Sequence, residues 1–203
     1  MLWIAVAAGL AEPVAVNPIS WWSPDDMPAY VQRQGVTRRL LTRTTVQPDG
    51  KIQSCAVEVS SGDVALDTLT CEIILQRGKF LPAHWMDGST VYGVHRQTMT
   101  WLIGERSQNK YLPVDFDLTV NQLPRGFKSP VIIWATLALD EHGHPLSCIQ
   151  EPPNNGNRNT DQRLLAITCS TLMKDFKGTP AIDEAGNSIR SVQNASVRFA
   201  TSP

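Results

Sequence analysis

The chain contains one unit written twice, and its four cysteines mark the two copies. In each copy a glycine lies five positions before the first cysteine, and the second cysteine lies eleven positions before a Pro-Ala pair. The matching positions are Gly50, Cys55, Cys71 and Pro82 in the first copy, and Gly143, Cys148, Cys169 and Pro180 in the second. The second copy has five extra residues near the asparagine-rich stretch 154–159. Such a duplication predicts two related blocks rather than one continuous core.

Each copy is predicted to fold in the order strand, tight turn, strand, helix and strand. Apolar side chains alternate along the first strand of the second copy, which is the period of a half-buried strand. They are Val131, Ile133, Ala135, Leu137 and Leu139. In the first copy Cys55 shares a strand face with Val57 and Val59, so we expect its side chain to point inward.

A helix is expected after the turn Ser60-Ser61-Gly62, where Ser61 or Asp63 can cap its first turn. Its counterpart is expected to begin near Thr160-Asp161. The second helix has an apolar stripe at helical spacing that includes a cysteine: Leu165, Cys169, Leu172 and Phe176. We expect Cys71 to face the sheet from the first helix.

Each cysteine pair would therefore join a strand to the helix packed on it. Structural zinc usually needs close-spaced ligand pairs, and catalytic redox cysteines usually lie two positions apart. Neither spacing occurs, so we predict the disulfides Cys55–Cys71 and Cys148–Cys169. A disulfide closing a loop of this size stabilises a small domain by about 3 kcal/mol. The alternative is four buried thiols in a reducing cytosol.

The composition excludes some classes of partner and leaves the compartment open. Lys and Arg total 18 and Asp and Glu total 19, so no strong positive field favours nucleic acid or an anionic membrane. Residues 2–11 are apolar, but as a helix they would span only about 15 Å, half of a bilayer core. We interpret residues 1–16 as a signal-like segment with an incomplete start, and the alternative is an ordinary apolar N-terminus.

The first copy resembles the C-terminal domain of TonB-family proteins. The likeness lies in Asp26-Met27-Pro28-Ala29, in the segments 46–51 and 59–62, in Leu66-Asp67, in Phe80-Leu81-Pro82-Ala83 and in Asp87-Gly88. The second copy is a diverged repeat that has lost the Ser-Ser-Gly turn. We therefore predict two tandem domains, at residues 17–104 and 105–203.

The resemblance implies an α+β fold, in which each TonB-C-like ββαβ domain is a three-stranded antiparallel sheet packed on one helix. It also implies partner binding by pairing of an exposed strand with an extended peptide, as of an outer-membrane transporter. The last strand of each copy, at residues 91–102 and 189–200, is the expected edge. Edge pairing of this kind would also allow a homodimer.

The resemblance leaves two functions open. The first is a non-enzymatic periplasmic module that binds a protein or peptide and is at most peripheral to a membrane. The second is an energy transducer for outer-membrane transport, anchored in the inner membrane by a segment missing from this sequence. An upstream stretch of apolar residues would favour the second.

Six residues are the candidates for partner contact: Trp21, Trp22, Met27, Pro28, His95 and Gln97. Trp21 and Trp22 lie in a segment of low regularity, where they could dock across the repeats or onto a partner. Trp101 and Trp134 lie in predicted strands, and we expect both to be core residues.

No pattern points to catalysis, a metal or a cofactor. His142 and His144 have no evident third ligand, so we expect a solvated turn there. The serines of the Ser-Ser-Gly turn are better explained by helix capping than as nucleophiles. Asp115 and Asp117 alternate with apolar residues and are expected on the solvated face of an extra strand at 112–120. No glycine-rich phosphate loop follows a strand.

Overall fold

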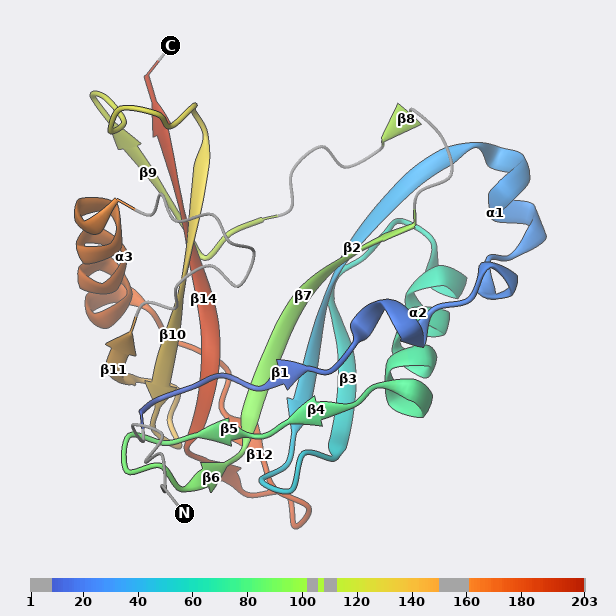
Figure 1. Ribbon diagram of the computed structural model, residues 1–203, viewed down its shortest axis with the longest axis horizontal. Coiled ribbons are helices and arrows are strands. Elements are labelled where there is room, and N and C mark those ends of the chain that lie inside the picture. The colour runs from blue at the N-terminus through green and yellow to red at the C-terminus, as the bar shows by residue number, and fades with distance from the viewer. Residues whose placement is uncertain (1–8, 102–105, 108–112, 150–160, 203) are drawn as a thin grey trace, which may run out of the picture. The chain divides into compact units, whose positions relative to one another are not determined.

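The computed structural model describes residues 9–101, 106–107, 113–149 and 161–202, and the chain divides into two compact units. The N-terminal unit comprises residues 13–83 and 92–113. The C-terminal unit comprises residues 1–12, 84–91 and 114–203. Both units combine strands with a helix (Figure 1). The predicted mixed α+β class is confirmed, and no helix of the described ranges is long and apolar enough to cross a bilayer.

The sheet of the N-terminal unit is built around one central strand. This strand, β2 (Val36–Val46), pairs antiparallel with β3 (Ile52–Val59) and with β7 (Gly93–Trp101). Helix α2 (Val64–Arg77) packs against β3. The short strand β8 (Arg106–Ser107) pairs parallel with the start of β2.

Shorter elements of this unit come before β2 and after α2 in the sequence. Before the sheet come strand β1 (Val14–Ala15), the 3-10 turns η1 (Pro18–Trp21) and η2 (Pro24–Asp26), and helix α1 (Ala29–Gln34). After α2 comes β4 (Phe80–Leu81), which pairs antiparallel with β1. The segment before the sheet is thereby tied to the segment after the helix.

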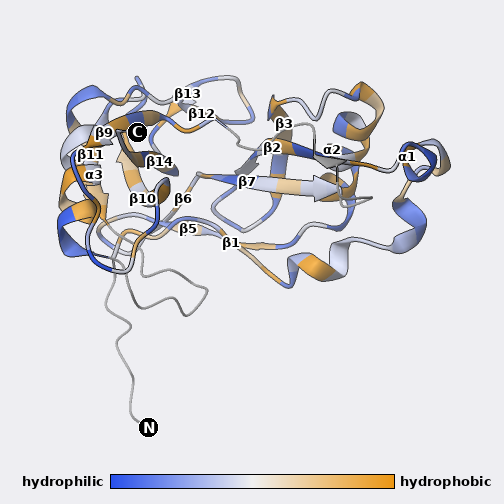
Figure 2. Ribbon diagram, turned by 90° about the horizontal axis from the view of Figure 1, so that it is seen from above, coloured by the Kyte–Doolittle hydropathy of each residue, from blue (hydrophilic) through white to orange (hydrophobic). Residues whose placement is uncertain are grey.

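The main elements of the C-terminal unit follow the same order of strand, strand, helix and strand, and one further strand comes before them. Strand β10 (Val131–Leu139) pairs antiparallel with β11 (Pro145–Ile149) and with β14 (Ser191–Thr201). Helix α3 (Gln162–Asp175) packs on these strands, and Figure 2 shows hydrophobic and hydrophilic residues alternating along it. Strand β9 (Phe116–Val120) pairs parallel with the end of β14.

A short hairpin follows the Pro-Ala pair in each copy. Strand β5 (Ala83–His84) pairs with β6 (Thr90–Val91), and β12 (Ala181–Ile182) pairs with β13 (Ser188–Ile189). The two hairpins start at equivalent positions of the duplicated sequence, so the repeat extends to these minor elements.

Each unit has its own hydrophobic core between the sheet and the helix. The N-terminal core includes Leu40, Val46, Leu66, Ile74 and Phe80. The C-terminal core includes Ile133, Leu137, Leu139, Leu172 and Phe199. Burying a side chain of this size contributes about 1.5–3 kcal/mol. The odd-numbered side chains of residues 131–139 face α3, as predicted. The strand is half-buried only in its first part, because Thr136 and Ala138 on the other face are buried as well.

Both predicted disulfides are present, and they account for all four cysteines. Cys55 of β3 is bonded to Cys71 of α2, with their Cα atoms 5.4 Å apart. Cys148 of β11 is bonded to Cys169 of α3, with their Cα atoms 5.7 Å apart. In the N-terminal unit the bond joins α2 to β3, which pairs with the side of β2 opposite β7. In the C-terminal unit the bond joins α3 to β11, which pairs with the side of β10 opposite β14.

Aspartates cap both helices at matching positions. The carboxylate of Asp63 accepts the backbone N–H groups of Ala65 and Leu66 at the start of α2. Asp161 accepts the corresponding groups at the start of α3. Of the two residues predicted to cap α2, Asp63 is the one that does so. The hydroxyl of Ser61 instead accepts the backbone N–H of Asp63.

The expectation that Trp134 is a core residue is wrong. Its side chain is 41% exposed, whereas Trp101 is 7% exposed and lies in the core as expected. Successive side chains of a strand point to opposite faces. Because Ile133 and Ala135 of β10 face α3, Trp134 between them must face away from the helix.

The predicted extra strand is present, but β9 covers only Phe116–Val120 of the expected range 112–120. Strand β9 covers β14 over Val197–Thr201, so this part of the expected strand edge is already paired. Asp115 is not a solvated residue, because its carboxylate accepts the backbone N–H of Ser196 at 2.7 Å. Asp117 is more exposed and forms an ion pair with Arg198.

Replacing Cys55 and Cys71 together by alanine is expected to lower the free energy of unfolding by about 3 kcal/mol, because the unfolded chain loses a cross-link. Urea unfolding followed by circular dichroism measures this loss. The double alanine variant of Cys148 and Cys169 is the matched comparison and should lose a similar amount. Two variants as stable as the wild type would contradict the stapling role.

Candidate functional site

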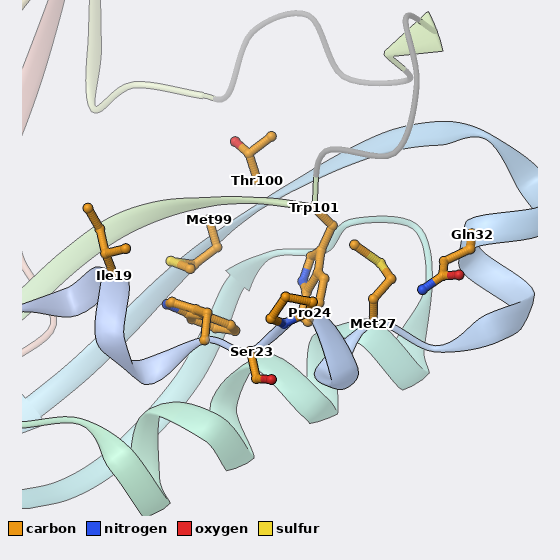
Figure 3. A pocket seen from close by; sticks show the side chains of 9 residues that line it. Ile19, Ser23, Pro24, Met27, Gln32, Met99, Thr100 and Trp101 are labelled. Carbon is orange, nitrogen blue, oxygen red and sulfur yellow. The ribbon is translucent and has the colours of Figure 1, made fainter.

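A groove on the N-terminal unit lies between two segments that are far apart in sequence. One is residues 13–28, which we call the strap and which contains β1, η1 and η2. The other is the end of β7. The groove has a volume of about 660 Å³, which is within the usual size of a binding pocket. Figure 3 shows the lining side chains, which are Ile19, Trp22, Ser23, Pro24, Met27, Gln32, Met99, Thr100 and Trp101.

Two indoles form the rigid part of the groove. The rings of Trp22 and Trp101 meet edge to face, with centroids 5.5 Å apart. The indole N–H of Trp101 donates to the hydroxyl of Thr70 at 3.0 Å, which fixes the ring to α2. Such an aromatic pair adds about 0.5–1.5 kcal/mol beyond the area that it buries.

The other apolar side chains make the groove adaptable and accessible. Met27 and Met99 contribute flexible, polarizable thioethers, which suit binding of varied apolar groups. Ile19 is 89% exposed, which is unusual for a large apolar side chain that has a core available nearby. The groove therefore presents apolar surface that the described part of the chain leaves uncovered.

Polar groups in the groove come from three different elements. Ser23 is already engaged at the start of η2, where its backbone N–H donates to Asp26 and its hydroxyl accepts the N–H of Asp25. Gln32 of α1 and Thr100 of β7 are exposed to solvent. These few polar groups beside an apolar floor are typical of a site that orients a bound segment.

The strap is held on the unit by a short strand pairing and one buried indole. β1 pairs with β4, and the backbone N–H of Val16 donates to the carbonyl of Lys79 at 2.8 Å. The side chain of Trp21 is 2% exposed and packs on Phe80, with ring centroids 5.4 Å apart. Its indole N–H donates to the carbonyl of Val16. Trp21 is thus the core anchor of the strap.

A second anchor lies at the far end of the strap. Arg77 of α2 forms two hydrogen bonds to the carboxylate of Asp26, at 2.7 and 2.9 Å, and a third to the carbonyl of Trp21. The hydrogen bonds from Arg77 hold the pKa of Asp26 below its ordinary value, and the backbone N–H of Ser23 acts in the same direction. Asp26 is therefore ionised and paired at neutral and mildly acidic pH.

His95 and Gln97 lie on β7 with their side chains half-buried. The Nε2 atom of His95 is 3.2 Å from the side-chain oxygen of Gln97, and its ring lies 5.2 Å from the ring of Phe80. Burial lowers the pKa of His95, and hydrogen bonding to Gln97 and the Pro13 backbone offsets part of that lowering. The imidazole is therefore neutral at pH 7.

The structure places the six candidate contact residues on the strap and on β7. Trp22 and Met27 line the groove, whereas Trp21 is buried in the core and is not on the surface. The carbonyl of Pro28 accepts the first backbone hydrogen bonds of α1. His95 and Gln97 lie along β7 outside the groove lining.

Sequence reasoning missed several groove residues. Met99 is on the same face of β7 as Trp101, so strand alternation could have placed the two together once the strand was identified. Ile19, Pro24 and Gln32 carry no such signal, because they lie in the strap and α1, whose course depends on tertiary contacts.

The turn at His142 and His144 is organised by Asp140. One carboxylate oxygen of Asp140 accepts the backbone N–H groups of both histidines. Within the residues that the structure describes, no cluster of three histidine, cysteine or acidic side chains has the arrangement of a metal site.

The serines of the Ser-Ser-Gly turn serve the start of α2. The carboxylate of Asp67, which is 9% exposed, accepts the hydroxyl of Ser60 and the backbone N–H of Ser61. The hydroxyl of Ser60 also accepts the N–H of Gly62. This arrangement satisfies backbone donors at the helix start, as a capping motif does.

Comparison with protein-family models, curated proteins and solved structures found no match. The resemblance to TonB-family C-terminal domains therefore stays a hypothesis drawn from the residues themselves.

Replacing Arg77 by methionine is expected to lower the melting temperature of the N-terminal unit, because Asp26 and the Trp21 carbonyl lose their partner. Arg33→Met, at an exposed position of α1, is the matched control and should change little. Since the folded pKa of Asp26 lies below its unfolded value of about 3.9, the ion pair stabilises above that pH. The difference from the wild type should shrink as the pH falls through the folded pKa, and thermal scans between pH 7 and pH 2.5 test this.

Proposed function

We propose that the protein is a non-enzymatic binding protein that holds an extended segment of a partner protein in the groove of its N-terminal unit. The observation that carries this proposal is the groove itself. It combines a fixed pair of indoles with two thioethers and an exposed isoleucine. Aromatic anchors in a partly preformed apolar pocket are the usual source of binding energy for a partner side chain.

The segment that fits this groove carries a large apolar side chain on an extended backbone. The floor offers no charged group, so the inserted side chain would be an apolar one such as leucine, methionine or an aromatic residue. Ser23, Gln32 and Thr100 can accept or donate hydrogen bonds, which suits backbone groups on either side of that residue. The proposed ligand is therefore a stretch of polypeptide rather than an ion or a sugar.

Strand pairing is the second component of the proposal. Among the described residues, β2 is the only strand that pairs with β3. The outward-facing side chains of β3, Ser54, Ala56 and Glu58, are exposed. A strand with an unpaired side can accept an extended peptide through its backbone groups. In this unit we therefore assign strand addition to β3.

The proposal includes the descent of both units from a TonB-C-like ββαβ domain. It is supported by the shared order of strand, strand, helix and strand, with the first strand central in each unit. The equivalent disulfides and aspartate caps support it as well. Two disulfides also favour an oxidising compartment, for which we propose the periplasm.

Selection of a displayed library of extended peptides against the full chain tests the function. We expect enrichment of peptides with a large apolar residue. Ile19→Asp should weaken their binding by about tenfold or more, because it places a charge in an apolar groove. Ile182→Asp is the matched control, since Ile182 is also exposed but belongs to β12 of the C-terminal unit.

Two results would count against the proposal. Failure to enrich any peptide, or equal binding to both variants, would remove the groove as the site. Selected peptides that protect the amides of β3 from hydrogen exchange, while binding both variants equally, would reassign the site to the strand edge.

A further inference from the structure

The outer face of the N-terminal sheet, which is the face turned away from α2, carries more positive than negative charge. Strands β2, β3 and β7 together contain a single acidic residue, Glu58 of β3. Two arginines that lie directly opposite each other in the ladder, Arg43 of β2 and Arg96 of β7, form ion pairs with it. Their Nε atoms lie 3.7 and 2.8 Å from its carboxylate oxygens. Two guanidinium groups therefore share this carboxylate.

These three charged side chains are only partly exposed to water. The side chains of Arg43, Arg96 and Glu58 are 17, 12 and 27% exposed. Salt screens the interactions of partly buried charges much less than those of exposed charges. A second carboxylate on this face would therefore be attracted, because the two positive charges outweigh the repulsion from Glu58.

Ala56 of β3 lies between Arg43 and the side of the sheet where a partner strand would add. Arg43 is directly opposite Ala56 in the ladder, and Ala56 is exposed. Because neighbouring strands lie about 4.8 Å apart, a strand added to β3 would place one residue about 10 Å from the backbone of Arg43. The methyl group of Ala56 would lie between the two side chains. A glutamate at that position and the long side chain of Arg43 can together span this distance.

The irregularities of β3 limit where an added strand can pair. The register between β2 and β3 is regular over Ser54–Val57 and shifts at both ends of this run. Such a shift bends the strand and interrupts regular pairing. Within the run Cys55 faces α2 through its disulfide, so Ser54 and Ala56 face outward. An added strand thus has two outer-face positions, and the one beside Ala56 is in line with Arg43.

We propose that the partner segment that adds to β3 is acidic: it carries a glutamate beside Ala56, and the carboxylate of that glutamate binds Arg43 on the outer face of the sheet. This assignment rests on the proposed function, in which β3 pairs with the partner. The two flanking residues of the segment turn to the other face, next to Cys55 and Val57, which pack against the core. Apolar residues are therefore expected there. Aspartate is a poorer fit than glutamate, because its shorter side chain does not reach past Ala56.

Two short synthetic peptides of alternating threonine and valine are the probes, one with a central glutamate and the other with a central glutamine in a threonine position. Titration of the full chain followed by NMR measures the dissociation constant of each, and hydrogen exchange measures protection of the β3 amides. The glutamate peptide should bind about tenfold more tightly and protect β3. This ratio should fall as the salt concentration rises, because screening weakens the ion pair.

Variants test the charge and the path to it separately. Arg43→Gln should bring the ratio of the two dissociation constants to about one, and Arg43→Lys should restore part of it. Ala56→Thr should lower the ratio as well, because a larger side chain then lies between the glutamate and Arg43, and it covers the case in which Arg43→Gln does not fold. Ser54→Thr makes a similar change at the other outer-face position of β3 and is the matched control, which should keep the wild-type ratio.

The possible failures can be told apart. Equal binding of the two peptides to the wild type, or a full ratio that persists in Arg43→Gln, would overturn the acidic preference and leave the proposed function standing. If neither peptide binds and the β3 amides stay unprotected, both the acidic preference and strand addition at β3 are wrong. The groove is tested independently by Ile19→Asp, so its failure is a separate result.

Discussion

The packing of one short helix on a three-stranded sheet sets the conditions for everything else in the N-terminal unit. Helix α2 is held over β3 by the Cys55–Cys71 bond, which places it towards one side of the sheet. The same face of β7 must then be covered by another part of the chain. The strap provides that cover, because Trp21 enters the core and Trp22 packs on Trp101.

Covering a sheet with an irregular segment has a physical consequence that a second helix would not have. A helix satisfies its own backbone, whereas the strap depends on a few contacts made at separate points. These are the β1–β4 pairing, the indole of Trp21 and the Arg77–Asp26 ion pair. Between these points the strap forms one wall of the groove.

The C-terminal unit has the same arrangement of sheet and helix, but an added strand covers part of its last strand, β14. Strand β9 pairs with the end of β14 and contributes Phe116 and Leu118 to the core. Asp115 and Asp117 secure this strand to Ser196 and Arg198. The duplicated framework thus tolerates different additions, which is expected where loops and added strands carry the differences between copies. The proposed binding site belongs to the N-terminal unit alone.

The sequence by itself determined the features that depend on local spacing. Strand alternation identified the inward face of residues 131–139, acidic residues marked the helix starts, and cysteine spacing predicted both disulfides. These are reliable because each follows from the geometry of one element or of two adjacent ones. The mixed α+β class follows from the same patterns.

Only the tertiary structure decided how the irregular segments lie. Trp21 and Trp22 are adjacent and chemically identical, yet one is a core anchor and the other lines a groove. Trp134 faces away from the helix because its neighbours in the strand, Ile133 and Ala135, point towards the helix. Residues 13–28 have no periodicity to interpret, so their path is fixed by distant partners such as Phe80, Arg77 and Gly93. Contacts of this long range are set by the folded chain as a whole, and no local pattern encodes them.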